Sequence, residues 1–170
     1  VVFVTGANRG IGRAIAEEAL ARGAKKVYAA ARDVAGVQDL VDQDPGRVVA
    51  IQLDVTNAEH IDSAAAQAQD VQILINNAGV AGFSGFIYGH DPEGARREME
   101  TNYFGPLNVS RAFADAIVSN GNGAVATVIS RGGLTNFPPA ASYSASKAAA
   151  HSLTQGMRAE LAPQGVAVFG

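Results

Sequence analysis

The apolar residues of this chain gather into short runs that contain almost no polar positions. Runs of this kind, four to six residues long and rich in Val, Ile and Ala, are typical of strands that are buried on both faces of a sheet. We predict six strands from them, at residues 1–4, 27–31, 48–53, 71–75, 124–129 and 166–169.

Between these runs, apolar residues recur with the period of a helix. Gly23 follows the first such stretch, and Pro163 and Gly165 follow the last, as residues that end helices do. Inside the fourth stretch, Gly105-Pro106 should bend or locally unwind the helix, because proline has no N–H group to donate. The predicted helices are residues 13–21, 37–43, 58–69, 93–119 and 142–161.

Strands and helices therefore alternate along the chain, which favours the α/β class. Near-continuous apolar strands joined by helices indicate a doubly wound parallel sheet, Rossmann-like, with helices on both faces. No repeat, low-complexity segment or second domain is visible, so residues 1–170 are interpreted as a single domain.

Composition narrows the range of partners. With 48% hydrophobic and 17% charged residues the chain is globular, and its net charge of −3 gives no basic footprint for nucleic acid or an anionic membrane. The absence of cysteine excludes disulfides and thiolate chemistry. No apolar run approaches the ~20 residues of a membrane span, and no signal peptide is seen. We therefore expect a cytoplasmic protein without nucleic-acid or membrane partners.

A glycine-rich loop lies between the first predicted strand and the first predicted helix, with the sequence Thr5-Gly6-Ala7-Asn8-Arg9-Gly10-Ile11-Gly12. Glycines let the backbone approach a pyrophosphate closely, and a helix N-terminus offers unpaired N–H groups and a positive dipole end. The strand–loop–helix context is the one that a dinucleotide site requires, so the loop predicts such a site rather than a tight turn without a ligand.

The end of the second predicted strand bears on which nicotinamide cofactor binds. An acid at that place accepts a hydrogen bond from the 2′-hydroxyl of NAD(H) and repels the 2′-phosphate of NADP(H). Ala31 stands there, Arg32 follows it, and Arg9 lies in the glycine-rich loop. Two guanidinium groups at one ribose predict NADP(H) over NAD(H), with the Asp33 carboxylate as the competing partner for a 2′-hydroxyl.

Tyr143 and Lys147 stand four residues apart, which places both side chains on one face of a helix. A neighbouring ammonium lowers the pKa of a phenol toward the range that suits acid–base catalysis. Ser130 lies thirteen residues before Tyr143, at the exit of the fifth predicted strand, and can hold a substrate oxygen. These three residues are the candidate catalytic group, and a solvated helix face is the alternative.

Polar residues also follow other predicted strands. Asp54, after the third strand, is either a helix cap or a ligand contact. Asn76 and Asn77, after the fourth, either lock neighbouring strands together or face a ligand. Asn102, just before Gly105-Pro106, is placed to point a side chain and a freed carbonyl inward.

The loop at residues 80–92 carries three aromatic residues, Phe83, Phe86 and Tyr88. Aromatic residues in a loop that follows a strand can form one wall of a substrate pocket. His90 in the same loop is interpreted as a loop or capping residue rather than a catalytic base.

Together these residues resemble the short-chain dehydrogenase/reductase (SDR) family in its single-domain form. Residues 5–12 look like its TGxxxGxG loop, residues 76–79 like its NNAG motif, and Tyr143 with Lys147 like its YxxxK motif. The resemblance covers the whole chain. It implies the catalytic tetrad Asn102, Ser130, Tyr143 and Lys147.

The resemblance also implies roles for these residues. Tyr143 would be the general acid and base, and Lys147 would lower the pKa of Tyr143 and bind the nicotinamide ribose. Ser130 would orient the substrate oxygen, and Asn102 would hold a water in a proton relay.

By the same resemblance, Asp54 and Val55 would contact the adenine, and residues 77–79 the adenosine ribose. No metal site is predicted. The predicted cofactor-binding residues are Gly6, Asn8, Arg9, Gly10, Ile11, Gly12, Arg32, Asp54, Val55, Asn77, Ala78, Gly79, Tyr143 and Lys147.

The implied function is that of a carbonyl reductase: NADP(H)-dependent, reversible hydride transfer between a nicotinamide and an aldehyde or ketone. The alternatives are a 3-oxoacyl-carrier-protein reductase and a non-catalytic nucleotide-binding regulatory or scaffold protein of the same fold. The resemblance further implies a homodimer or homotetramer assembled through the helices predicted at residues 93–119 and 142–161.

Two features depart from the family pattern. Arg131 stands where members often have a second Ser beside the catalytic one. Family members also continue past the sixth strand with a Pro-Gly turn, a Thr that holds the nicotinamide, a substrate loop and a last strand. Since the chain also begins inside a strand, we expect residues 1–170 to be a dinucleotide-binding catalytic domain that is incomplete at both ends.

Overall fold

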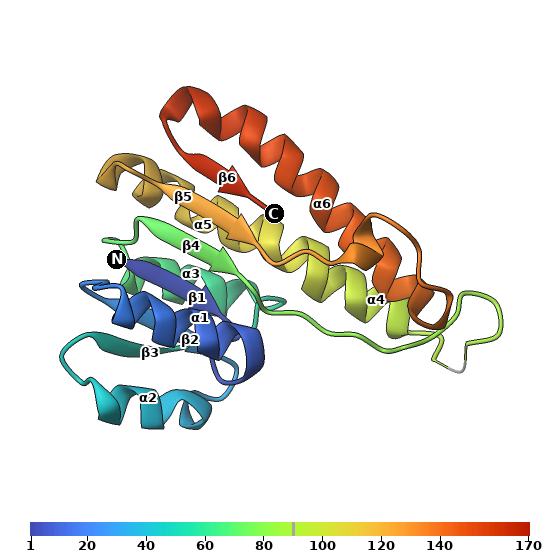
Figure 1. Cartoon of the computed structure of the whole chain (residues 1–170), viewed down its shortest axis with the longest axis horizontal. Coiled ribbons are helices and arrows are strands. Elements are labelled where there is room, and N and C mark those ends of the chain that lie inside the picture. The colour runs from blue at the N-terminus through green and yellow to red at the C-terminus, as the bar shows by residue number, and fades with distance from the viewer. Residues whose placement is uncertain (90) are drawn as a thin grey trace.

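Six parallel strands form one sheet in the order β3-β2-β1-β4-β5-β6, which confirms the predicted doubly wound, Rossmann-like fold (Figure 1). The computed structural model describes residues 1–89 and 91–170, so His90, interpreted above as a loop or capping residue, lies outside the described residues. The strands are β1 (Val2–Thr5), β2 (Val27–Ala31), β3 (Val48–Gln52), β4 (Ile73–Asn76), β5 (Ala124–Thr127) and β6 (Ala167–Phe169).

The chain builds the sheet outward from β1 to β3 and then returns to place β4 on the other side of β1. Val2 in β1 accordingly pairs with Val27 of β2 on one side and with Ile73 of β4 on the other. In open sheets of parallel strands, ligands bind at the carboxyl ends of the strands where the strand order reverses. The crevice beyond the ends of β1 and β4 is therefore the place to look for a site.

Helices cover both faces of the sheet (Figure 1). The helices α1 (Gly10–Ala21) and α2 (Gln38–Gln43) pack on one face, and α3 (Ala58–Gln67), α5 (Gly105–Asn120) and α6 (Ala141–Leu161) on the other. A short helix α4 (Gly94–Met99) precedes α5. Single turns of 3₁₀ helix are η1 (Val34–Val37), η3 (Arg131–Gly133), η4 (Pro138–Ala140) and η5 (Ala162–Gln164).

Each face of the sheet has an apolar core of its own. Val4, Ala29 and Leu40 lie in the core beneath α1 and α2. Phe3 and Phe113 lie in the core beneath α3, α5 and α6, with their ring centroids 4.6 Å apart. Because β1 contributes to both cores, all four of its residues must be apolar or fully hydrogen-bonded, which explains the unbroken apolar run in the sequence.

The long helix predicted at residues 93–119 is interrupted. A π-helical turn, η2 (Glu100–Phe104), separates α4 from α5, and Pro106 lies in the first turn of α5. In a continuous α-helix the N–H of residue 106 would bond to the carbonyl of Asn102, and proline has no N–H group. The break predicted at Gly105-Pro106 therefore takes the form of a widened turn directly before it.

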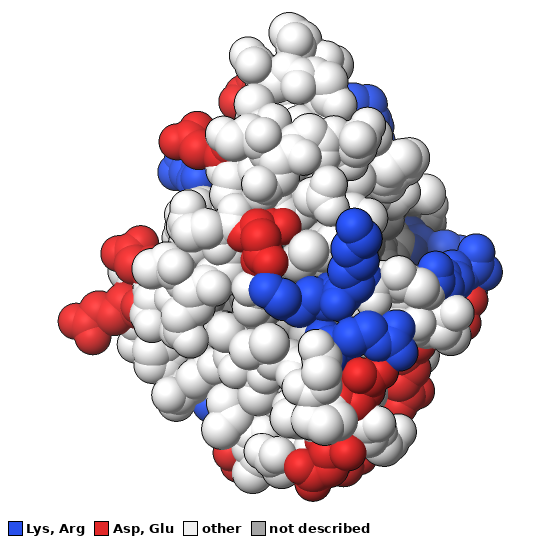
Figure 2. Space-filling view, turned by 90° about the vertical axis from the view of Figure 1, so that its left-hand side faces the viewer, with Lys and Arg blue, Asp and Glu red and all other residues white. Residues whose placement is uncertain are grey.

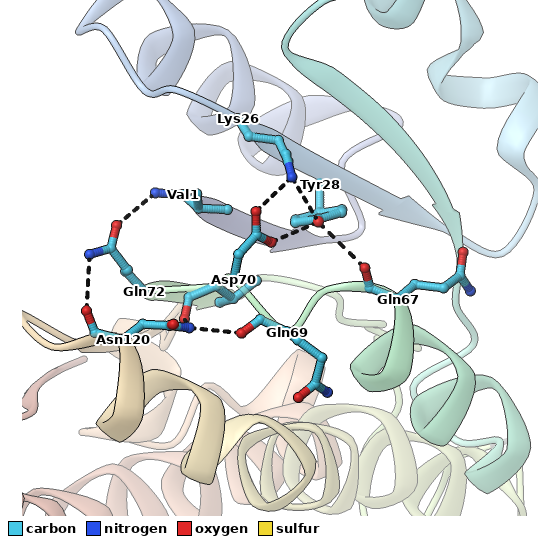
Figure 3. A network of polar contacts seen from close by, with 9 residues as sticks. Val1, Lys26, Tyr28, Gln67, Gln69, Asp70, Gln72 and Asn120 are labelled. Carbon is cyan, nitrogen blue, oxygen red and sulfur yellow. Dashed lines mark hydrogen bonds and ion pairs between the residues drawn. The ribbon is translucent and has the colours of Figure 1, made fainter.

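At the amino-terminal edge of the sheet, opposite the crevice, polar contacts join neighbouring segments of the chain (Figure 3). Lys26 Nζ donates to one carboxylate oxygen of Asp70 at 2.6 Å, and the Tyr28 hydroxyl donates to the other at 2.7 Å. Burial raises the pKa of Tyr28, and the bond to Asp70 raises it further. Asn120 Nδ2 donates to the backbone carbonyl of Gln69 at 2.8 Å. These contacts tie β2 and the end of α5 to the connection that leads into β4.

Positive and negative side chains lie beside one another at this edge (Figure 2). Lys and Arg side chains gather in the middle of this face (Figure 2), and three ion pairs next to the amino ends of the strands match part of that charge with neighbouring acids. They are Arg22–Glu18, Lys26–Asp70 and Arg47–Asp44.

Among the described residues, no helix is both long enough and apolar enough to cross a membrane. In the same part of the chain, no three or more His, Asp or Glu side chains are grouped so that they could hold a metal ion.

We predict that Phe113→Ala lowers the free energy of unfolding by about 3–5 kcal/mol, because it removes a fully buried ring and leaves a cavity. Phe86→Ala is the matched control, since its ring is 61% exposed, and it should change that free energy by no more than about 0.5 kcal/mol. Urea denaturation of both variants measures the difference, and similar losses in the two would contradict the assignment of the core.

Candidate active site

The glycine-rich loop joins β1 to α1 and leaves the N-terminus of α1 open. Gly6 and Gly10 have φ angles of +65° and +56°, which favour glycine. A Cβ at Gly12 would overlap the Asn77 side-chain amide and the Gly6 carbonyl, so only glycine fits there. Arg9 precedes α1 and makes no side-chain capping bond, which leaves the first N–H groups of the helix available for a phosphate.

Hydrogen bonds fasten this loop to the end of β4. The Thr5 hydroxyl accepts from the backbone N–H groups of Asn77 and Ala78, both at 2.9 Å. The Asn77 side-chain amide donates to the carbonyls of Thr5 (2.9 Å) and Gly6 (3.1 Å). Asn76 Nδ2 donates to the Ser110 hydroxyl of α5 at 2.9 Å. Of the two alternatives left open for these amides, the side-chain contacts support locking of neighbouring elements, and Asn77 also lines a cleft.

A cleft of about 1120 Å³ lies along the carboxyl ends of the strands. It extends from the glycine-rich loop past the ends of β2 and β3 to residues 77–82 and α4. Predicted cofactor-binding residues that line it are Gly6, Asn8, Arg9, Gly10, Ile11, Arg32, Asp54, Val55, Asn77, Ala78 and Gly79. Three predicted cofactor-binding residues are not among those that line it: Gly12 packs against Asn77 behind the loop, and Tyr143 and Lys147 lie on α6.

The charged residues that line the cleft beside the end of β2 differ in whether they have a hydrogen-bond or ion-pair partner. The Asp33 carboxylate accepts from the N–H of Ala35 at 3.0 Å and so caps η1. Arg9 and Arg32 line the cleft, and among the described residues their guanidinium groups form no ion pair. The two cations are therefore available to a ligand, whereas one oxygen of the Asp33 carboxylate, which also lines the cleft, accepts the bond from Ala35.

Asp54 is held in the turn after β3. Its Oδ1 accepts from the backbone N–H (3.0 Å) and the hydroxyl (2.7 Å) of Thr56, and Asn57 is the residue that caps α3. Burial raises the pKa of Asp54, but the bonds from Thr56 and the charge of Arg32 outweigh it and lower the pKa below its usual value. Asp54 is thus an ionised turn residue that also lines the cleft.

Tyr143 and Lys147 lie on the same face of α6, as their spacing predicts. The Lys147 ammonium is 5.9 Å from the centroid of the half-buried Tyr143 ring. Lys147 is only 5% exposed, and its Nζ donates to the carbonyl of Val128 at 2.7 Å. Burial lowers the pKa of Lys147 to about 8.

Asn102 lies in the π-helical turn and is 1% exposed. Its Oδ1 accepts from the N–H of Val80 at 2.9 Å, and its Nδ2 donates to the Val80 carbonyl (2.8 Å) and the Ser146 hydroxyl (2.9 Å). The Ser146 hydroxyl donates in turn to the Tyr143 carbonyl at 2.7 Å. A Cβ at Gly79 would lie 3.1 Å from Asn102 Oδ1 and 3.6 Å from Lys147 Nζ, so three predicted site residues meet here.

Ser130 stands where the chain leaves β5. It caps η3, with its Oγ accepting from the N–H of Gly132 at 3.1 Å, so the hydroxyl hydrogen can still be donated. A Cβ at Gly132 would lie 3.4 Å from Ser130 Oγ and 3.1 Å from the Ser144 hydroxyl, which places Ser130 close to the start of α6.

Three residues that organise the site were assigned no role of their own from the sequence: Thr5, Glu98 and Ser146. Thr5 and Ser146 bond to residues of the predicted motifs, and their positions directly before Gly6 and Lys147 were a signal that could have been used. Glu98 is 1% exposed and lines the cleft four residues before Asn102.

Known proteins are similar to this chain over almost its whole length. A family model described as short chain dehydrogenase matches residues 1–170. A protein of Cereibacter sphaeroides named galactitol 2-dehydrogenase (L-tagatose-forming) is 41% identical over 97% of the chain and 66% of its own length. Dehydrogenase/reductase SDR family member 7B of Xenopus tropicalis is 33% identical over 96% of the chain and 56% of its own length. The chain thus spans roughly 56–66% of these two relatives.

Solved structures are similar over almost the whole chain. A short-chain dehydrogenase from Burkholderia cenocepacia in complex with NADP superposes with a TM-score of 0.93 and 49% identity, over 98% of this chain and 68% of that one. A metagenomic short-chain oxidoreductase in complex with NADP gives a TM-score of 0.87 and 30% identity, over 99% of this chain and 79% of that one.

Lys147 should make stability depend on pH. Its pKa in the folded chain is about 8, below the ordinary 10.5, so the unfolded chain binds more protons between these two pH values. The free energy of unfolding should therefore rise with pH through this window, relative to Lys147→Met, by up to about 3 kcal/mol, since each pH unit within it contributes about 1.36 kcal/mol. Urea denaturation from pH 7 to pH 10.5 measures this free energy, and parallel pH profiles for the two proteins would argue against a lowered pKa of Lys147.

Proposed function

The chain belongs to the short-chain dehydrogenase family, and we propose that it is an NADP(H)-dependent oxidoreductase that reversibly reduces an aldehyde or ketone to an alcohol. The single observation that carries this proposal is the pairing of Tyr143 with the buried Lys147. An ammonium in the protein interior is weakly screened, so it stabilises the negative charge that Tyr143 carries after giving up its proton. Tyr143 can then donate a proton to a developing alkoxide and take it back in the reverse reaction.

Ser130 and Asn102 complete the proposed catalytic group. The Ser130 hydroxyl has a hydrogen left to donate to a substrate carbonyl oxygen, which would hold that oxygen toward Tyr143. Asn102 connects the π-helical turn to Ser146 and, through it, to the Tyr143 turn of α6. We assign Asn102 the task of keeping that turn in place, in addition to the water-holding role that the family resemblance implies.

The cleft fits a dinucleotide. The backbone N–H groups at the start of α1 would bind the pyrophosphate, and Gly12 gives the loop the close contact with Asn77 that keeps them exposed. Asp54 and Val55 would lie beside the adenine, and residues 77–79 beside its ribose. Bound there, a nicotinamide cofactor supplies the hydride.

Three observations support NADP(H) as the preferred cofactor. The Burkholderia cenocepacia and metagenomic structures are complexes with NADP. In this chain, Arg9 and Arg32 line the cleft, and one oxygen of Asp33, the competing partner for a 2′-hydroxyl, caps η1. A 2′-phosphate would therefore meet two cations, although the Asp33 carboxylate also lines the cleft. The name of the Cereibacter sphaeroides relative supports the interconversion of an alcohol and a ketone as the reaction class.

Tyr143→Phe should abolish turnover and largely spare cofactor binding, because it removes the proton donor while the hydroxyl adds little to the dinucleotide contacts. Oxidation of NADPH with a panel of aldehydes and ketones, followed at 340 nm in the full-length protein, measures turnover, and cofactor fluorescence measures binding. A Tyr143→Phe protein that keeps a large share of the wild-type kcat would refute the role assigned to Tyr143.

Lys147→Ala should lose both rate and cofactor affinity.

Arg9→Ala and Arg32→Ala should each lower kcat/KM with NADPH by roughly tenfold or more and leave the value with NADH nearly unchanged, because charge-assisted bonds to the phosphate are lost. Arg22→Ala is the control, since Arg22 is exposed at the opposite edge of the sheet and pairs with Glu18. Equal losses with both cofactors in the Arg9 and Arg32 variants, or equal wild-type efficiency with both, would overturn the NADP(H) preference.

A further inference from the structure

Residues 80–82 continue from the end of β4, and side chains hold their backbone. The N–H and carbonyl of Val80 bond to the side-chain amide of Asn102. The N–H of Gly82 donates to Glu98 Oε1 at 2.6 Å. Asn102 and Glu98, four residues apart, thus bind two alternate backbone positions of one segment.

Glu98 is unusual among the acidic residues of the chain because it is 1% exposed. One carboxylate oxygen accepts from Gly82, and the other is buried with no partner in the described protein. Burying a carboxyl group with a single hydrogen bond is costly, so an apolar residue would suit this position better if packing were its only task. The residue also lines the cleft, which places it at the site and not in the remote core.

The segment that Glu98 holds leads directly into the apolar part of the loop before α4. Phe83 is a non-glycine residue with a φ of +48°, so the chain turns sharply just after Gly82. The side chains that follow are exposed, including those of Phe86, Ile87 and Tyr88. The Ser84 carbonyl accepts from the N–H of Ala141, the first residue of α6, at 3.2 Å. The loop is therefore fixed by Glu98 on one side of Phe83 and by the start of α6, near Tyr143, on the other.

We propose that Glu98 is a positioning residue that fixes the apolar loop at residues 83–88 beside Tyr143 and so sets how a carbonyl substrate with apolar groups is held; this rests on the proposed function. Glu98 acts through the backbone of Gly82 and moves no proton. The cofactor site is secured separately by the bonds of Thr5 and Asn77. Loss of the Glu98 bond should therefore affect the substrate and leave the cofactor.

A matched pair of variants separates the hydrogen bond from packing. Glu98→Gln keeps an acceptor for Gly82 at the same length, and Glu98→Met keeps the length without an acceptor of comparable strength. Glu160→Ala is the control for a change of charge, since Glu160 is exposed at the far end of α6.

Hydrogen exchange of the Gly82 amide tests the contact without any need for activity. In the full-length wild type this amide should be protected, in Glu98→Met it should exchange about tenfold faster or more, and in Glu98→Gln and Glu160→Ala it should stay protected. An unprotected Gly82 amide in the wild type would overturn the proposal, even if Glu98→Met failed to fold. So would Glu98→Gln exchanging as fast as Glu98→Met.

Kinetics with NADPH and two ketones, acetophenone and acetone, test the consequence for the substrate. In Glu98→Met the KM for acetophenone should rise about tenfold while kcat and the cofactor Kd change by less than about threefold, and the KM for acetone should change little. A matched rise in the cofactor Kd would overturn the proposal. A wild type that reduces no carbonyl compound would instead refute the proposed function, and the exchange of Gly82 would still decide whether Glu98 fixes the loop.

Discussion

The cleft at the carboxyl ends of the strands depends on how the ends of β1 and β4 are joined. The Thr5 hydroxyl and the Asn77 amide form a closed set of bonds across that junction, and Gly12 packs against the same amide. Because Gly12 has no Cβ, α1 can begin immediately beside the end of β4 and direct its N-terminus into the cleft. The position of the cleft, at the point where the strand order reverses, therefore depends on a contact in which only glycine fits at residue 12.

A second constraint is the missing N–H of Pro106. A π-helical turn precedes Pro106, and Asn102 in that turn is buried, where it bonds to Val80 and Ser146. One backbone defect therefore links the segment after β4 to the helix that carries Tyr143. Lys147 is also buried, its Nζ donates to the Val128 carbonyl, and burial lowers its pKa. Both features cost stability, and both lie at the proposed site rather than elsewhere in the fold.

Much of this arrangement could be predicted from the sequence, because it follows from periodicity and from residues with few conformational options. Unbroken apolar runs predicted the strands and that they are parallel, and glycine and proline predicted the loop and the broken helix. Which partners a polar side chain takes could not be predicted: Asp33 was expected only as a partner for a 2′-hydroxyl, and the structure shows that it also accepts a bond from Ala35 while it lines the cleft. Glu98 was missed for a related reason, since a glutamate in an amphipathic helix reads as exposed until its burial is known.

The exposed loops carry a consequence for how such a protein changes over evolutionary time. Phe86, Ile87, Leu134 and Phe137 contribute little to either apolar core, because most of their surface is in water. The Lys26–Asp70 network and the cores on the two faces of the sheet hold the molecule together without them. Substitutions in these loops can therefore accumulate at almost no cost in folding, so the loops can diverge among descendants of one ancestor while the sheet beneath is inherited unchanged.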